Sequence, residues 1–295
     1  MQNYIFKMNI IPETELILTE KKRIYHLNLI REEIARDIIL VGDPSRVKMI
    51  SNKFDIIEHK ISHREFITHT GMLNNKKISV ISTGIGTDNI DIVINELDAI
   101  FNIDFKTRKI KKNKTTLNII RVGTSGAIQQ NIPINSCIVS TYALGFDGLA
   151  HYYESNKVLK KDILNKFNKY FKISEKLAEP YFIKASDDLL NIFQDLKQGI
   201  TATTSGFYAP QDRKLRLNPS INDLSKRLNK FSYNNIRITN FEMETSALYY
   251  LGQTLGHNTL TICAVLGNRN TNNYSKNTNE TINNMIDIVL KRLCK

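Results

Sequence analysis

The sequence is poor in cysteine and has no long apolar run, and each absence excludes a class of protein. Its three cysteines, Cys137, Cys263 and Cys294, are odd in number and widely spaced, so neither a disulfide framework nor a zinc site is indicated. No segment approaches the ~18 consecutive apolar residues of a membrane-spanning helix. The opening residues lack the apolar core and small-residue cleavage site of a secretory signal. We therefore expect a cytoplasmic protein with no membrane partner.

The charge balance is the one unusual bulk property. The 295 residues carry a formal net charge of +12, with ordinary shares of hydrophobic (41%) and charged (24%) residues. Such a charge indicates either an anionic substrate or a nucleic-acid partner. The only dense basic run is 106–114, whereas the other lysines are scattered. We interpret this run as a solvated loop, with nucleic-acid contact as the less favoured alternative.

Short apolar runs alternate with segments of helical period along most of the chain, which is typical of an α/β fold. Helices are expected over 88–101, 240–255 and 279–293. Strands are expected over 37–41, 77–82, 117–122, 136–140, 200–204 and 259–266. No internal repeat or low-complexity linker occurs. The prediction is a single-domain, three-layer α/β/α fold with a mixed, largely parallel central sheet.

Glycine-containing segments after three expected strands could present backbone N–H groups to an anion. They are 42–46 (GDPSR), 84–86 (GIG) and 121–126 (RVGTSG). None completes a dinucleotide fingerprint, and no GxxxxGK[ST] phosphate loop occurs. Taken alone, each is more simply interpreted as a tight turn with a surface arginine.

Three arginines accompany these segments. Arg46 and Arg121 lie within two of them, and Arg64 lies in Ser62–Phe66 (SHREF). Together they could surround a phosphate dianion, because guanidinium groups bind phosphate oxygens in a fork. The alternative for Arg64 alone is a surface ion pair with Glu65.

Two further segments offer groups that suit a nucleoside. Glu242 and Glu244 open the expected helix 240–255; we interpret Glu242 as a cap or dipole partner. Glu244 can turn inward, where its carboxylate could accept hydrogen bonds from ribose hydroxyls. In 205–213, Phe207 could stack on a base and the Gln211 amide could bind a pyrimidine edge. The alternative there is a loop with a buried aromatic.

The order and spacing of these segments resemble the nucleoside phosphorylase family, most closely its uridine phosphorylase branch. The matching segments are YHL (25–27), GDPSRV (42–47), SHREF (62–66), STGIG (82–86), RVGTSGAIQ (121–129), GFYAPQDR (206–213), FEMET (241–245) and NR (268–269). The resemblance implies an N-terminal extension over 1–24 and one nucleoside phosphorylase domain over 25–295, with an insert at about 102–118.

The resemblance also implies a role for each matching residue. Phosphate would be bound by Gly42, Arg46, Arg64, Arg121 and Thr124. Ribose would be held by His26, Thr124, Met243 and Glu244. The base would be held by Ser125, Gly126, Phe207, Gln211, Arg213 and Arg269. Catalysis would rest on Arg121, Gln211, Arg213 and Glu244. His26 and Arg64 would reach in from a neighbouring subunit.

The implied reaction is phosphorolysis: uridine and phosphate give uracil and α-D-ribose 1-phosphate through an oxocarbenium-like ribosyl group. Phosphate is a co-substrate, so no cofactor is expected. A monovalent cation such as K⁺ could lie near Glu65 at a dimer interface, although Asn89 replaces the serine usual at a second ligand position. The implied assembly is a homo-oligomer with shared active sites, a dimer-based hexamer.

Three alternatives remain open. A purine nucleoside phosphorylase or a nucleosidase of the same fold would carry an aspartate after the last strand, where this chain has Gly267-Asn268-Arg269. A basic nucleic-acid-binding protein would interleave aromatic with basic residues, which this sequence does not. A catalytically silent relative is disfavoured by the intact set of Arg46, Arg121, Gln211 and Glu244.

Overall fold

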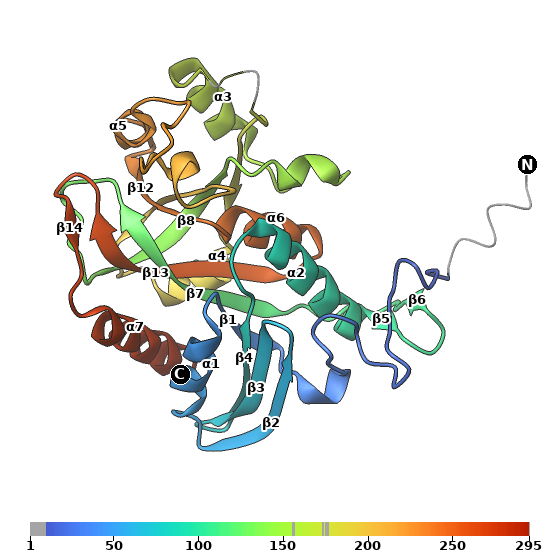
Figure 1. Cartoon of the computed structure of the whole chain (residues 1–295). Helices are drawn as coiled ribbons and strands as arrows, with labels where there is room; N and C mark the ends of the chain where they lie inside the picture. The colour runs from blue at the N-terminus through green and yellow to red at the C-terminus, as the bar shows by residue number, and fades with distance from the viewer. Residues whose placement is uncertain (1–9, 155–156, 173, 175–176, 295) are drawn as a thin grey trace, which may run out of the picture. The chain divides into compact units, whose positions relative to one another are not determined.

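The computed structural model describes residues 10–154, 157–172, 174 and 177–294. The first nine residues of the predicted N-terminal extension therefore lie outside the described residues. The chain divides into two compact units, coloured along the sequence in Figure 1. The first comprises Met1–Gly84 and Asp91–Leu117, and the second comprises Ile85–Ile90 and Asn118–Lys295.

The first unit is built on a four-stranded sheet. Its strands, in spatial order, are β1 (Asp37–Val41), β4 (Lys76–Ser82), β3 (Phe66–Leu73) and β2 (Ile56–His63). β1 and β4 are parallel, and the other neighbours are antiparallel. Helix α1 (Pro44–Ser51) follows β1 at once, because Asp43 caps it and Pro44 is preorganised for a first turn.

The segment predicted as an insert, about 102–118, contains a small hairpin in the first unit, and its basic run 106–114 is largely exposed. The hairpin comes directly after helix α2 (Thr87–Asn102), and its strands are β5 (Ile103–Asp104) and β6 (Lys109–Ile110). The 3₁₀ turn η1 (Arg31–Glu33) lies earlier in the chain. Arg108, beside β6, donates from Nε to the Ile11 carbonyl at 2.7 Å and from Nη2 to the Pro12 carbonyl at 2.8 Å. This hairpin therefore holds the chain at Ile11 and Pro12.

The second unit contains a sheet that closes on itself. Its strands, in spatial order, are β11 (Ser232–Tyr233), β12 (Ile236–Glu242), β10 (Gln198–Thr203), β8 (Cys137–Gly145), β13 (Asn258–Asn268) and β7 (Asn118–Ala127). A further pairing joins Asn240 to Ala127 and Phe241 to Gly126, so that β12 also lies beside β7. Strands β9 (Tyr181–Lys184) and β14 (Asn273–Tyr274) extend the sheet from β8 and β13.

Helices cover this second sheet. They are η2 (Leu149–Tyr152), α3 (Lys161–Tyr170), α4 (Asp187–Ile192), η3 (Ala209–Gln211), α5 (Leu224–Asn229), α6 (Thr245–Thr254) and α7 (Thr278–Leu293). Both α6 and α7 pack against β13, which runs between them in Figure 1. Within the described residues, no helix is long and apolar enough to cross a membrane.

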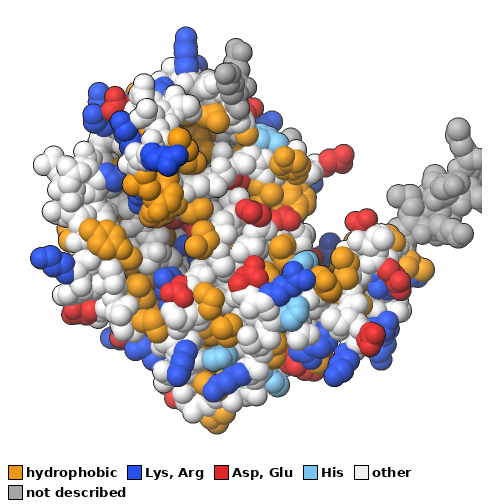
Figure 2. All heavy atoms as spheres, viewed as in Figure 1, with side chains coloured by type: hydrophobic (Ala, Val, Ile, Leu, Met, Phe, Trp, Pro, Cys, Tyr) orange, Lys and Arg blue, Asp and Glu red, His pale blue; other side chains and the backbone are white. Residues whose placement is uncertain are grey.

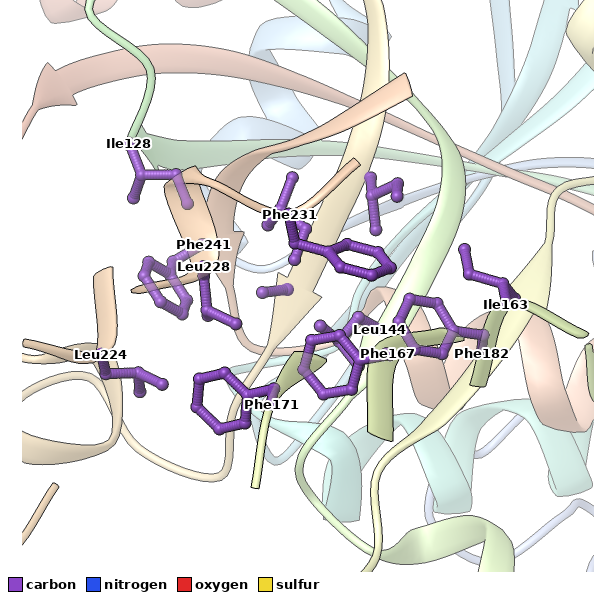
Figure 3. Close-up of a cluster of buried hydrophobic side chains, with 13 residues drawn as sticks. Ile128, Leu144, Ile163, Phe167, Phe171, Phe182, Leu224, Leu228, Phe231 and Phe241 are labelled. Carbon is purple, nitrogen blue, oxygen red and sulfur yellow. The ribbon is translucent and has the colours of Figure 1, made fainter. Parts of the chain in front are cut away.

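A phenylalanine-rich core anchors β12 just before Glu242. Phe167 stacks on Phe171 with ring centroids 5.2 Å apart and meets Phe182 and Phe231 edge to face (Figure 3). Such aromatic pairs add about 0.5–1.5 kcal/mol each to the energy of burial. Phe241 of β12 lies in the same cluster. This packing fixes the strand end that carries the acidic side chains.

The mixed sheet is confirmed, but antiparallel pairings are more numerous than a largely parallel sheet implies. Two local predictions were wrong. The turn expected at 123–126 is a continuation of β7, because β13 and β12 pair with it there. The helix expected from Asn240 begins at Thr245, because 240–242 belongs to β12.

Candidate active site

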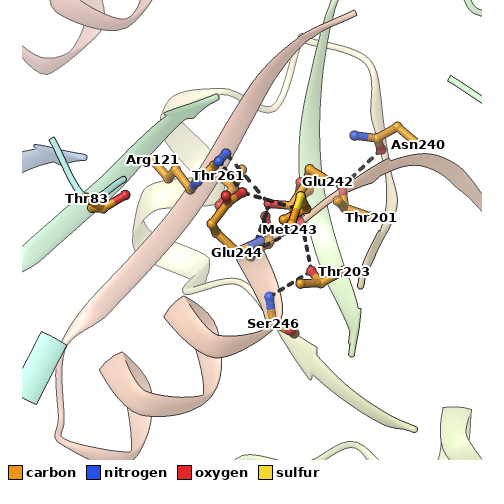
Figure 4. A network of polar contacts seen from close by, with 12 residues as sticks. Thr83, Arg121, Thr201, Thr203, Asn240, Glu242, Met243, Glu244, Ser246 and Thr261 are labelled. Carbon is orange, nitrogen blue, oxygen red and sulfur yellow. Dashed lines mark hydrogen bonds and ion pairs between the residues drawn. The ribbon is translucent and has the colours of Figure 1, made fainter. Parts of the chain in front are cut away.

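Arg121 and two glutamates form a buried ionic centre in the second unit (Figure 4). Arg121 lies on β7, Glu242 ends β12, and Glu244 is the residue before α6. Arg121 Nη2 donates to Glu244 Oε2, and Arg121 Nη1 lies 3.6 Å from Glu242 Oε2. Burial opposes the charge of Arg121, but the two carboxylates outweigh it and raise the Arg121 pKa. The β7–β12 pairing therefore brings together motifs far apart in the sequence.

Arg121 retains donors for a further acceptor. Its Nε and Nη1 atoms are buried and make no hydrogen bond with the described residues. A buried donor without an acceptor costs about 1–3 kcal/mol. The centre is thus suited to a ligand that brings oxygen atoms to this guanidinium.

Gly123 is needed by the side chain of Arg121. A Cβ atom at position 123 would lie 1.8 Å from Arg121 Nη1 and 3.3 Å from Cys263 Sγ. The guanidinium therefore lies directly over the backbone of its own strand. The sequence indicated a role for this glycine in an anion-binding turn, whereas the structure shows a close side-chain approach.

Glu244 has the backbone contacts of a held carboxylate. Its Oε1 accepts from the Gly86 N–H at 2.9 Å, so the GIG segment meets FEMET within the second unit. Its Oε2 also accepts from the Met243 N–H at 3.2 Å. Met243 is partly buried beside it.

Gln211 lies at the centre of a second, cationic cluster. Its Oε1 accepts from Arg213 Nη1 at 2.8 Å and from Arg269 Nη2 at 3.1 Å, and its Nε2 donates to the Glu242 carbonyl at 3.3 Å. Arg213 also lies over the Phe207 ring, 3.6 Å from its centroid. Burial lowers the pKa of Arg213, and burial together with Arg213 lowers that of Arg269 to about 10. Both remain cations at neutral pH.

Ser125 and Gly126 of β7 border the cationic cluster. The Ser125 hydroxyl and Arg269 Nε are buried and have no hydrogen-bond partner among the described residues. A Cβ at Gly126 would lie 3.7 Å from Arg213 Nη2 and 3.8 Å from Arg269 Nε. Thr124, which precedes Ser125 on β7, is only partly buried. Phe207 is 49% exposed, so the alternative of a buried aromatic in this loop is wrong.

The remaining predicted residues lie in the first unit. Gly42 follows β1 directly, and Arg46 is buried on the first turn of α1. His26 Nδ1 contacts Glu96 Oε1 at 2.7 Å, and Arg64 Nη2 donates to the Tyr25 hydroxyl at 3.3 Å.

The predicted position of a monovalent cation is near Glu65. Glu65 is exposed in the β2–β3 turn. The described residues contain no group of three His, Cys, Asp or Glu side chains that could hold a metal. The monovalent cation near Glu65 stays a prediction, and no chemical step is assigned to it.

A family profile described as "Phosphorylase superfamily" matches residues 36–295. The chain belongs to the phosphorylase superfamily. The predicted family, the predicted fold class and the prediction of an enzyme are therefore confirmed.

Several members of the superfamily are similar to this chain along most of its length. The uridine phosphorylase of Thermococcus kodakarensis is 34% identical over 261 residues, which cover 88% of this chain and 82% of that protein. A DeoD-type purine nucleoside phosphorylase of Brevibacillus brevis is 28% identical, covering 90% and 96%. The crystal structure of a Trypanosoma brucei nucleoside phosphorylase, described as showing uridine phosphorylase activity, matches with a TM-score of 0.85 at 27% identity, covering 95% and 99%.

Sequence reasoning underestimated Glu242 and missed Glu96. Glu242 was predicted to be a cap or dipole partner, but it also faces Arg121. Because a helix was expected from Asn240, nothing in the sequence indicated that both acids face the same guanidinium. Helical periodicity indicates only that Glu96 is a polar position of the helix. Its contact with His26 could therefore not be predicted from the sequence.

Proposed function

We propose that this phosphorylase cleaves uridine with inorganic phosphate, producing uracil and α-D-ribose 1-phosphate. The observation that carries the proposal is the cluster of Gln211, Arg213 and Arg269. Departing uracil carries negative charge on its carbonyl oxygens, and two partly buried cations around an amide stabilise that charge as it develops. The similar proteins named as uridine phosphorylases support the same substrate.

The residue that ends β13 favours a pyrimidine over a purine. A purine would leave most readily with a proton supplied to N7, yet position 268 holds a neutral asparagine. Its Nδ2 donates to the carbonyls of Gln129 at 2.9 Å and Ile132 at 2.7 Å, so the side chain has a structural task. The similarity to purine phosphorylases keeps purine cleavage as the alternative.

In the proposed mechanism, Arg121 and Glu244 serve the sugar and the phosphate. Glu244 accepts hydrogen bonds from ribose hydroxyls, while the unpaired donors of Arg121 bind phosphate beside C1′. Cleavage builds positive charge on the ribosyl ring, and the phosphate dianion stabilises this charge before attacking C1′. Burial raises the pKa of the Cys263 thiol to about 12, so Cys263 is not a nucleophile.

The remaining assignments are part of the same proposal. Gly42, Arg46 and Thr124 complete the phosphate site. Arg64 and His26 act in a neighbouring subunit of a dimer-based hexamer, and the exposure of Arg64 supports this. We also propose a cytoplasmic location and no cofactor.

A nucleic-acid-binding role is less well supported. Figure 2 shows Lys and Arg side chains scattered over the visible face, interspersed with acidic and apolar ones. A dispersed charge of this kind does not form the basic stripe expected of such proteins.

A panel of nucleosides tests the choice of base. With phosphate present, uridine should release its base at least ~10²-fold faster than inosine, because a site built to hydrogen-bond its substrate can discriminate by about 10⁴-fold or more. The measurement is chromatography of the free base. Faster cleavage of inosine would assign the enzyme to purines instead.

A further inference from the structure

Glu242 is held more firmly than a helix cap requires. Its Oε1 accepts from Thr203 Oγ1 at 2.6 Å. Its Oε2 accepts from the backbone N–H groups of Glu244 and Thr245, each at 2.9 Å (Figure 4). The side chain is buried, so these donors replace water around the carboxylate. The orientation of Glu242 is therefore fixed from both β10 and the start of α6.

The same carboxylate faces the guanidinium that Glu244 binds. Arg121 Nη1 lies 3.6 Å from Glu242 Oε2, while Nη2 bonds to Glu244. Glu242 thus acts on Glu244 through its backbone and on Arg121 through charge. Removing this one acid would release a constraint on both residues.

The charges of the group oppose each other. Burial and the charge of Glu244 raise the pKa of Glu242, whereas Arg121, Thr203 and Thr245 lower it, with a result of about 7. Cys263 and Tyr249 also face the carboxylate of Glu242. Burial raises the pKa of the Cys263 thiol and of the Tyr249 phenol, so both side chains stay neutral. The carboxylate form of Glu242 therefore diminishes as the pH falls through about 7.

We propose that Glu242 is a positioning residue that fixes Arg121 and Glu244 in the arrangement needed for phosphorolysis. The inference rests on the proposed function, because it assigns those two residues to phosphate and ribose. Glu242 acts through its neighbours and need not touch the substrate.

The test is Glu242→Gln, which keeps the shape but replaces one acceptor oxygen with an NH₂ donor. We expect kcat/KM for phosphate to fall roughly 10- to 100-fold, as when an outer-shell partner of a bound group is removed. In the wild type, kcat/KM should decline as the pH falls through about 7. In Glu242→Gln this decline should shrink to the part that phosphate itself contributes.

Asp147→Asn is the matched control. Asp147 accepts from Tyr181 Oη at 2.6 Å, from Ser246 Oγ at 2.6 Å and from the Leu149 N–H at 2.9 Å. It thus supports the same end of α6 without a described contact to Arg121 or Glu244. We expect this variant to lower Tm while keeping kcat/KM and its pH profile. If Glu242→Gln behaves in the same way, Glu242 is merely structural and the inference is overturned.

A crystal structure of Glu242→Gln tests the positioning independently of activity. We expect the Arg121–Glu244 ion pair or the Glu244–Gly86 hydrogen bond to be lost. Both contacts unchanged would overturn the inference even in an active enzyme. A wild type that releases no uracil with phosphate would instead overturn the proposed function, and the crystal structure would still decide the role of Glu242.

Discussion

At the scale of single residues, Gly123 and Arg121 show how the sequence marked the right place for a different reason. The glycine was predicted to bend the chain around an anion, but it lies in β7 and leaves room for the Arg121 side chain. Composition and spacing locate such a motif. They do not reveal which side chain packs against a given stretch of backbone, because that depends on packing between distant segments.

Gly123→Ala should displace Arg121. The added Cβ would lie 1.8 Å from Nη1, so the guanidinium must move away from Glu244. We expect kcat/KM to fall about 10²-fold, the usual cost of a 1 Å misplacement at a catalytic centre. The control is Gly267→Ala on β13, where the new methyl group meets only Tyr274 and Asn273 at 3.4 Å or more. Equal kinetics for the two variants would contradict the close approach.

Arg213→Ala should remove one of the two cations around the base. We expect kcat to fall about 10²- to 10³-fold, because stabilisation of developing charge is lost. Arg227→Ala is the control, since Arg227 lies over the Phe171 ring at 4.0 Å in the same kind of contact. Steady-state kinetics with uridine decide the matter. A comparable loss in both variants would point to packing and not to charge.

At the scale of elements, the apolar strands and amphipathic helices were predictable, whereas their closure was not. The runs at 37–41, 200–204 and 259–266 became β1, β10 and β13 with small shifts at their ends. The pairing of β7 with β12 joins residues more than a hundred positions apart. Local sequence patterns do not specify the register of strands that pair over such a distance. For this reason residues 240–242 were predicted to be helical, although they belong to β12.

Glu96 should control the segment that carries His26. It accepts from the backbone N–H groups of His26 and Leu27 and from His26 Nδ1, all within the first unit. Glu96→Ala should speed hydrogen exchange at those two amides and raise KM for uridine. Glu32→Ala, which changes an exposed acid of η1, serves as the control. Unchanged exchange at His26 would exclude this anchoring role.

At the scale of the whole molecule, the family and fold followed from the joint spacing of motifs. The motifs keep the spacing of the family because each supplies its functional groups at the end of the corresponding strand. The division into two compact units was not predictable from the sequence. Neither was the hydrogen bond from Arg108 to the Ile11 carbonyl. Both depend on contacts between segments that share no local pattern.

The proposed sharing of active sites between neighbouring subunits predicts complementation. Arg64→Ala and Glu244→Gln should each be nearly inactive. Arg64→Ala impairs the pocket of the neighbouring subunit, whereas Glu244→Gln impairs the pocket of the subunit that carries it. Random mixing should restore about a quarter of the wild-type rate, because that fraction of sites receives no defect. The assay is uracil release after the two variants are dissociated and reassembled together. No recovery, with mixed oligomers verified by mass spectrometry, would place Arg64 outside a shared site.

The most direct measurement follows phosphate itself. Uridine is incubated with the purified protein, with and without inorganic phosphate, while ³¹P NMR and chromatography record the products. The account predicts one α-D-ribose 1-phosphate for each uracil, and no uracil release when phosphate is omitted. Equal uracil release without phosphate, accompanied by free ribose, would contradict it.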